Sequence, residues 1–108
     1  MNIIELIPHL KSIDAAEAFV KSTAPNIEYD LVDIFMIGEL GLNSEIIFFD
    51  AESISDNSIF QKEGIRYENL FPLNMAQEMV EEYVNIYKDG LSDLEIAKRL
   101  LDYRQRDA

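Results

Sequence analysis

The sequence has no cysteine and a single histidine, His9. Without cysteine the chain can form neither a disulfide framework nor a thiolate metal site. A lone histidine also excludes the usual zinc ligand sets and a Cys–His catalytic pair within one chain. His9 follows Pro8 in an apolar-faced segment, and we interpret it as a helix-surface or core residue rather than a ligand.

Basic residues are scarce. Nine Lys and Arg stand against twenty-one Asp and Glu, which gives a formal net charge of −12 and a sequence pI near 4.2. Binding to a phosphate backbone requires clustered Lys and Arg, and an anionic membrane surface would repel this chain. The composition therefore predicts neither a nucleic-acid partner nor a membrane partner.

Long apolar runs are also missing. No window approaches the roughly 20 apolar residues of a membrane span, and the N-terminal stretch lacks the basic start and apolar run of a signal peptide. We therefore expect a cytoplasmic protein. Its 108 residues, 48% of them hydrophobic, favour a single domain over residues 1–108 with its own core.

Sequence motifs for catalysis and cofactor binding are lacking as well. The chain contains no P-loop, no G-x-G-x-x-G and no G-x-S-x-G. An EF-hand loop that began at Asp50 would need Gly at 55 and Glu at 61, where the sequence has Ser55 and Gln61. We expect no catalytic residue, no metal and no cofactor, and hence no enzyme. A metal-dependent enzyme that uses the Asp50–Asp56 carboxylates remains a minor alternative.

Capping-box spacing, in which a capping side chain precedes Glu by three residues, predicts several helix starts. Pro8 should break or kink the first of these helices. Pro72 is placed to open a helix over 73–87, and Gly90 to supply its C-cap. The capping-box pairs are Asn2 with Glu5, Asp14 with Glu17, and Ser92 with Glu95.

Strand signals lie in the middle of the chain. Residues 45–50 form a short aromatic-rich run, and 58–71 read as a hairpin around Gly64. Residues 28–40 fit either a helix or a buried strand, and we interpret them as a helix that ends at Gly38. The predicted fold class is α+β, a compact domain with helices at both termini around a small antiparallel sheet.

The aromatic residues of this middle region allow two interpretations. They most often form a core, but they could also form a patch that faces a partner. In the 45–50 run, alternation predicts that either Phe48 or Phe49 is partly exposed. An aromatic side chain surrounded by carboxylates would be a favourable hot spot for binding. The residues concerned are Phe35, Phe48, Phe49, Phe60, Tyr67 and Phe71.

The acidic residues concentrate where the basic ones are absent. No Lys or Arg occurs from Ser22 to Gln61. Such uncompensated charge costs stability through self-repulsion, and a complementary field would speed encounter with a basic protein. A merely solvated acidic face is the alternative. The carboxylates that we predict to bind a partner are Asp30, Asp33, Glu39, Glu45, Asp50, Glu52 and Asp56.

Three segments carry a resemblance to a known family. They are GLNSEIIFFDAESI, GIRYENLFPLNMAQEMVEEY and LSDLEIAKRLLDYRQRDA, all within residues 38–108. They resemble small bacterial immunity proteins of contact-dependent growth inhibition systems. The resemblance implies a protein without catalysis that binds and neutralises a cognate toxin domain in the cytoplasm. Many such toxins are basic nucleases, and commonly cut tRNA.

The resemblance also implies a monomer, or a heterodimer with the toxin. The main alternative is an acidic adaptor or regulatory subunit for a partner that is not a toxin. Under either interpretation the acidic middle of the chain is expected to meet a basic protein, and the segments that carry the resemblance are expected to be mostly scaffold.

Overall fold

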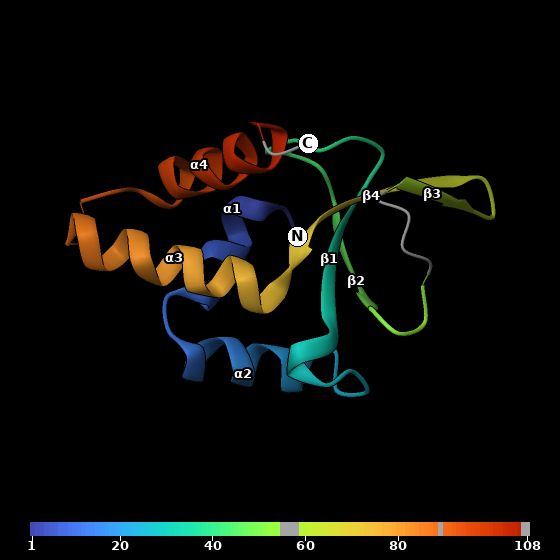
Figure 1. Cartoon of the computed structure of the whole chain (residues 1–108), viewed down its shortest axis with the longest axis horizontal. Helices are drawn as coiled ribbons and strands as arrows, with labels where there is room; N and C mark the ends of the chain where they lie inside the picture. The colour runs from blue at the N-terminus through green and yellow to red at the C-terminus, as the bar shows by residue number, and fades with distance from the viewer. Residues whose placement is uncertain (55–58, 89, 107–108) are drawn as a thin grey trace.

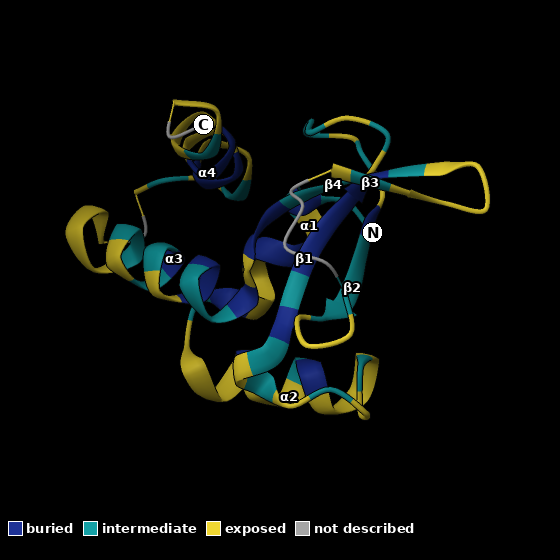
Figure 2. Cartoon of the chain, turned by 45° about the vertical axis from the view of Figure 1, so that its right-hand side comes forward, coloured by how far each residue is buried: buried dark blue, intermediate teal, exposed yellow. Residues whose placement is uncertain are grey.

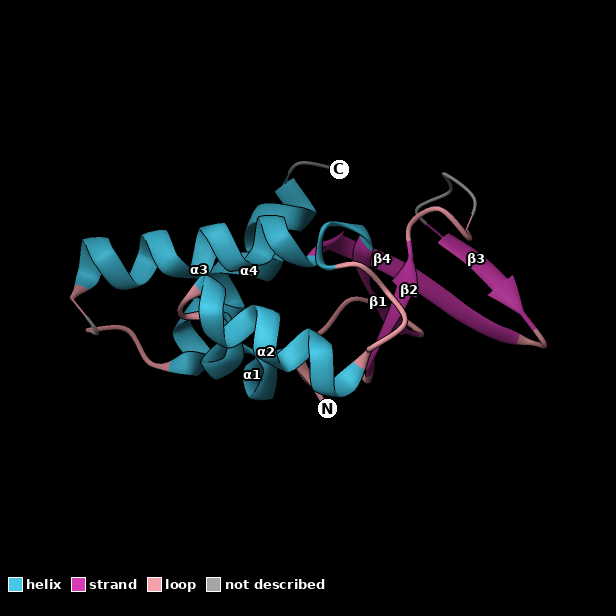
Figure 3. Ribbon diagram, turned by 90° about the horizontal axis from the view of Figure 1, so that it is seen from below, coloured by secondary structure: helices cyan, strands magenta, loops and turns pink. Residues whose placement is uncertain are grey.

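The computed structural model describes residues 1–54, 59–88 and 90–106. Within these ranges it is an α+β domain with helices at both ends of the chain, as the sequence predicts (Figure 1). The helices lie on one side of an antiparallel sheet (Figure 3). The elements are α1 (Ile3–Leu6), η1 (Ile7–Leu10), α2 (Ile13–Thr23), η2 (Tyr29–Leu31), β1 (Val32–Ile37), β2 (Ile46–Asp50), β3 (Ile59–Lys62), β4 (Ile65–Pro72), α3 (Leu73–Tyr87) and α4 (Asp93–Arg106).

The sheet has the strand order β2-β1-β4-β3 in the described residues. Strands β3 and β4 form the predicted hairpin, whose turn residues Glu63 and Gly64 both have positive φ, 54° and 81°. Two consecutive left-handed residues are typical of a tight hairpin turn, and glycine adopts this conformation without steric cost. The hairpin extends away from the helices (Figures 1 and 3).

The core lies between the helices and one face of the sheet. Val32, Ile34 and Met36 alternate along β1 and are at most 1% exposed. They belong to one apolar, mostly aliphatic cluster with side chains from all four α-helices of the described ranges (Figure 2). Because β1 is a central strand, its burial joins the sheet to the helical layer.

At the N-terminus, one predicted cap is confirmed and one is wrong. The side chain of Asn2 accepts a hydrogen bond from the backbone of Glu5, and the Glu5 carboxylate accepts one from the Asn2 N–H. The α-helix ends before Pro8, and the chain continues as 3₁₀ turns. Helix α2 is capped by Ser12 and not by Asp14, because Ser12 is extended and its hydroxyl accepts from Ala15.

The prediction of a helix over residues 28–40 is wrong. Only Tyr29–Leu31 form a short 3₁₀ turn, and Val32–Ile37 form strand β1. The period-2 pattern was hidden because Phe35 is also buried, on the other face of the sheet. A strand that is covered on both faces reads as a continuous apolar run, which periodicity does not distinguish from a helix. Gly38, with φ 85°, follows the end of the strand.

Helix α3 begins directly after Pro72, as predicted. Its C-cap, however, is Lys88, which adopts the left-handed conformation with φ 52°. The prediction that Gly90 caps this helix is therefore wrong. A Cβ at Gly90 would lie 2.8 Å from the Tyr87 carbonyl oxygen, so close backbone approach explains the glycine. The predicted capping box at Ser92 is present at the start of α4.

Candidate partner-binding surface

The sheet separates the predicted carboxylates into two groups. Strands β1 and β2 are antiparallel and pair Val32 with Asp50 and Met36 with Ile46. Residues before β1 therefore meet residues after β2, about 15 Å from the connection at the other end of the pair. We call the carboxylates at the first end the Asp33 group; they are Asp30, Asp33, Asp50 and Glu52. We call those at the other end the Glu45 group; they are Glu39 and Glu45. Asp56 lies outside the described residues.

Three of these carboxylates make contacts within the protein. Asp33 accepts a hydrogen bond from the Asn69 amide at 3.0 Å, which ties β1 to β4. Asp50 accepts one from the backbone of Glu52 at 2.9 Å and so orders the turn after β2. Glu45 forms a 3.0 Å ion pair with the N-terminal amine of Met1. Since the Glu45 side chain is largely exposed, this pair contributes little to stability.

The side chains of Asp30, Glu39 and Glu52 form no hydrogen bond or ion pair with any residue in the described ranges. All three are exposed. Asp30 and Glu52 lie at one end of the β1–β2 pair, and Glu39 lies at the other. Their charge is therefore uncompensated locally, and they are available to a partner.

The carboxylates do not gather into a metal site in the described part of the chain. No group of three or more His, Cys, Asp or Glu residues there is placed to hold an ion. The helices of the same ranges also lack the length and apolarity that a membrane crossing requires. The predicted Asp50–Asp56 alternative includes residues beyond those described.

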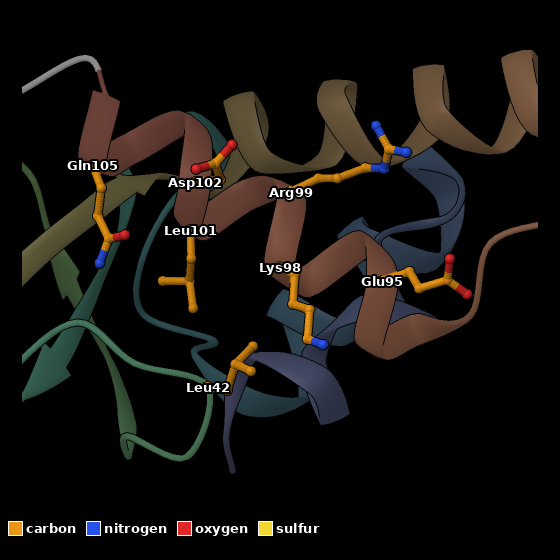
Figure 4. A pocket seen from close by; sticks show the side chains of 7 residues that line it. All are labelled: Leu42, Glu95, Lys98, Arg99, Leu101, Asp102 and Gln105. Carbon is orange, nitrogen blue, oxygen red and sulfur yellow. The ribbon is translucent and has the colours of Figure 1, made fainter.

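An open depression of about 590 Å³ lies between α4 and the β1–β2 connection. Glu95 and Arg99 are directed away from Leu42 and Leu101 at the centre, whereas Lys98 extends towards Leu42 (Figure 4). The acidic Glu95 and the basic Lys98 and Arg99 thus point in different directions. The lining residues are Leu42, Glu95, Lys98, Arg99, Leu101, Asp102 and Gln105.

Three charged residues of this depression make contacts within the protein, and one of them is Asp102, which forms a 3.1 Å ion pair with Arg106. The Glu95 carboxylate accepts hydrogen bonds from the Ser92 N–H at 3.2 Å and from its hydroxyl at 3.1 Å. The bond from the Ser92 backbone is the main reason that the pKa of Glu95 lies below its ordinary value. The Arg99 guanidinium lies over the rings of Tyr87 and Tyr83, at 4.8 and 5.9 Å from the centroids. Glu95 and Arg99 thus stabilise α4 and its contact with α3.

The sheet face that points away from the helices carries a second cluster, which we call the ring cluster. It takes one aromatic residue from each strand: Phe35, Phe49, Phe60 and Tyr67. Their ring centroids lie 5.1 to 5.4 Å apart, mostly edge to face. Phe35 and Tyr67 are buried, at 1% and 8% exposure, whereas Phe49 and Phe60 are half-buried.

Phe48 and Phe49 lie on opposite faces of the sheet, and both are half-buried. Phe48 packs on the helical side against Phe19, with ring centroids 5.8 Å apart. Phe19 in turn stacks on the exposed ring of His9 at 4.5 Å. The prediction that one of the two neighbours is partly exposed therefore understated the result. The prediction of a surface or core role for His9 is supported by this stacking.

Exposed isoleucines extend the face around the ring cluster. Ile37 pairs with Tyr67, and Ile65 pairs with Lys62, so both point to the same side as the rings. They are 38% and 41% exposed. All four rings are among the aromatic residues that the sequence suggested as a core or a patch, whereas Phe48 and Phe71 pack with the core on the helical side. The flanking Ile37 and Ile65 were missed because residues 28–40 were predicted as a helix. The alternation of Phe35 and Ile37 would have revealed this face if the segment had been read as a strand.

Comparisons with protein-family models, with curated proteins and with solved structures find no match for this chain. The resemblance to immunity proteins of contact-dependent growth inhibition therefore stays a prediction from the sequence.

Proposed function

We propose that this chain is an immunity protein. It binds the toxin domain of a contact-dependent growth inhibition system, a basic domain and in particular a nuclease such as a tRNase, and neutralises it. The observation that carries the proposal is the acidic middle of the chain, which has no Lys or Arg from Ser22 to Gln61. Its described part is built into β1, β2 and the segments that flank them.

The charge supports a role in binding. A net charge of −12 costs folding free energy through self-repulsion, and a basic partner would relieve that cost on association. The same field accelerates encounter with a basic surface and disfavours acidic proteins. A nuclease must present Lys and Arg to phosphate groups, and surface carboxylates such as Asp30, Glu39 and Glu52 can occupy those positions instead.

Inhibition by occupancy requires no chemistry from the immunity protein. Around the α4 depression, Glu95 and Arg99 point away from the central leucines, whereas Lys98 extends towards Leu42 (Figure 4). Among the described residues, the carboxylates do not gather around an ion. The proposed activity therefore consists of binding, and it is measured as affinity and protection.

The experiment that tests the proposal is co-expression. The toxic C-terminal domain encoded beside this gene would be expressed with and without this protein, and growth would be scored together with a pull-down at low and high salt. Rescue of growth with a stable complex is expected, with association slowed by salt. Absence of both rescue and complex would remove the toxin proposal. A complex with a basic protein that is not a toxin would favour the adaptor.

Charge reversal identifies the surface within the same assay. We expect Glu39→Lys with Glu52→Lys to slow association strongly. The control is Glu82→Lys with Asp102→Lys, which makes the same change in net charge on the exposed surface of α3 and α4. Equal effects of the two double variants would show that only the net charge matters, and would contradict a defined acidic surface.

A further inference from the structure

The geometry points to the ring cluster as the centre of the partner interface, and to an arginine side chain of a basic protein as the group that it receives. This inference names the contact that the proposed immunity function would use, and in that sense it rests on the proposed function. In this arrangement the carboxylates increase the rate of association with the partner, and the rings supply most of the binding free energy. The accessible surface consists of Phe49 and Phe60 with the flanking Ile37 and Ile65, and it lies over the buried rings of Phe35 and Tyr67.

The position of the rings makes them accessible to a partner. The helices pack on the opposite face of the sheet (Figures 1 and 3). Because each strand contributes one ring, the cluster spans the width of the sheet, about 14 Å at the usual strand spacing. Phe49 and Phe60 are only half-buried, and Ile37 and Ile65 are 38% and 41% exposed. Partly exposed aromatic residues of this kind are typical anchors of interfaces.

The charges on the β1–β2 side of the rings favour a cationic occupant, whereas Lys62 lies on the same face at the far end of the hairpin, beside Ile65. Asp33 lies in β1 beside Phe35, and the backbone carbonyl of Glu45 accepts a hydrogen bond from the Ile37 N–H. The Asp33 group and the Glu45 group thus border the two ends of the β1–β2 part of this face. A second copy of the chain, with the same net charge of −12, would be repelled. A basic protein surface is complementary.

Arginine fits this surface better than lysine does. Its guanidinium is planar, weakly hydrated and able to stack on an aromatic face while it donates hydrogen bonds to carboxylates. The protein already contains the stacking part of this arrangement, since the Arg99 guanidinium lies 4.8 Å from the centroid of the Tyr87 ring. A lysine ammonium would gain the attraction of the carboxylates but less from the ring faces.

The test is a titration of the full chain with two synthetic peptides that are identical except that one carries arginines and the other lysines. Methyl and aromatic NMR signals would be followed. We expect the arginine peptide to shift Ile37, Ile65, Phe60 and Tyr67, and to bind at least threefold more tightly than the lysine peptide. Equal affinities, with shifts confined to the carboxylate groups, would overturn the inference.

Two variants locate the effect. Phe60→Leu should abolish the preference for arginine while it retains the fold, as checked by circular dichroism and thermal unfolding. Ile86→Ala is the control, because Ile86 is 60% exposed on α3, away from the sheet. An arginine preference that survives in Phe60→Leu, or that is lost in Ile86→Ala, would contradict the assignment.

The same variants separate this inference from the proposed function. If the neighbouring toxin domain is neutralised equally by wild type and by Phe60→Leu with Phe49→Leu, the immunity function stands and the ring surface fails. If the toxin domain is neither bound nor neutralised while the arginine peptide still maps to the rings, the toxin proposal fails and the surface stands.

Discussion

The two faces of the sheet differ in the kind of side chain that they carry. On the helical side β1 presents Val32, Ile34 and Met36, which are aliphatic and at most 1% exposed. On the other side the strands present aromatic rings, and Phe49 and Phe60 remain half-buried. The same strands thus supply a closed surface for folding and an open one for contact. The comparison shows that one face of the sheet is closed by the helices, whereas the other leaves Phe49 and Phe60 half-buried and is the face that we propose for partner binding.

The helical face can be disrupted most strongly by Ile34→Ala. Ile34 is 0% exposed, and the substitution leaves a cavity between β1 and the helices. We expect the free energy of unfolding to fall by about 3 kcal/mol, measured by urea denaturation. Any molecules that remain folded should bind a partner normally. A loss below about 1 kcal/mol would show that this face tolerates cavities, in contrast to a close-packed core.

The open face is tested by Phe60→Leu. Its ring contacts Phe35, Phe49 and Tyr67, and their loss should lower the free energy of unfolding by about 1 kcal/mol. Binding to the toxin domain should weaken about tenfold, as for a hot-spot residue. Calorimetric titration and urea denaturation of one preparation give both numbers. A stability loss without any change in affinity would make the rings an ordinary second core.

Ser92→Ala provides the matched control for that comparison. The Ser92 hydroxyl accepts from the Glu95 N–H at 3.1 Å and caps α4, on the helical side of the molecule. Its loss should also cost about 1 kcal/mol, with no change in affinity for the toxin domain. Reduced affinity in this variant would show that moderate destabilisation alone weakens binding.

The smallest expected effect concerns Tyr29, whose buried hydroxyl oxygen has no hydrogen-bond partner in the described residues. Burial, followed by the charge of Glu17, raises the pKa of Tyr29. A raised pKa stabilises the folded state below the unfolded pKa, near 10, and this contribution is lost as pH rises through the folded pKa. Tyr29→Phe should leave stability unchanged or up to about 1 kcal/mol higher at pH 7.

The measurement for Tyr29→Phe is urea denaturation between pH 7 and pH 11. The variant should lose less stability than wild type above pH 10, because it has no phenol to ionise. A variant that is clearly less stable than wild type at pH 7 would show that the hydroxyl does have a partner.

Much of the fold could be predicted from the sequence because its signals are local. The capping boxes at Asn2 and Ser92, the helix after Pro72 and the turn at Gly64 each depend on residues within a few positions. The prediction of a helix over residues 28–40 failed because Phe35 is buried by rings from other strands. Its burial depends on tertiary contacts that one segment does not encode.

The candidate surface was predicted only in part. The absence of basic residues correctly indicated an acidic region. The sequence, however, suggested a single cluster of carboxylates, whereas the structure divides them into the Asp33 group and the Glu45 group. That division depends on the antiparallel register of β1 and β2. The four rings were named from the sequence as part of a possible patch, but separating them from Phe48 and Phe71 requires the pairing of four strands, including β1, which the sequence predicted as a helix.

The strand order has a consequence for how the chain folds. Strands β1 and β2 form one local pair and β3 and β4 another, and the sheet is complete only when β1 meets β4. That union includes the Asp33–Asn69 hydrogen bond, which joins residues 36 positions apart. Contacts this distant in sequence form slowly, so we expect the joining of the two pairs to limit the folding rate.

The four rings are divided between the two pairs of strands that join in that late step. Phe35 and Phe49 come from the first pair of strands, and Phe60 and Tyr67 from the second. The ring cluster therefore does not exist until the sheet has closed. A newly made chain would gain its charge at once but its ring surface only at the end of folding, so the interface that we propose on the rings would be restricted to fully folded molecules.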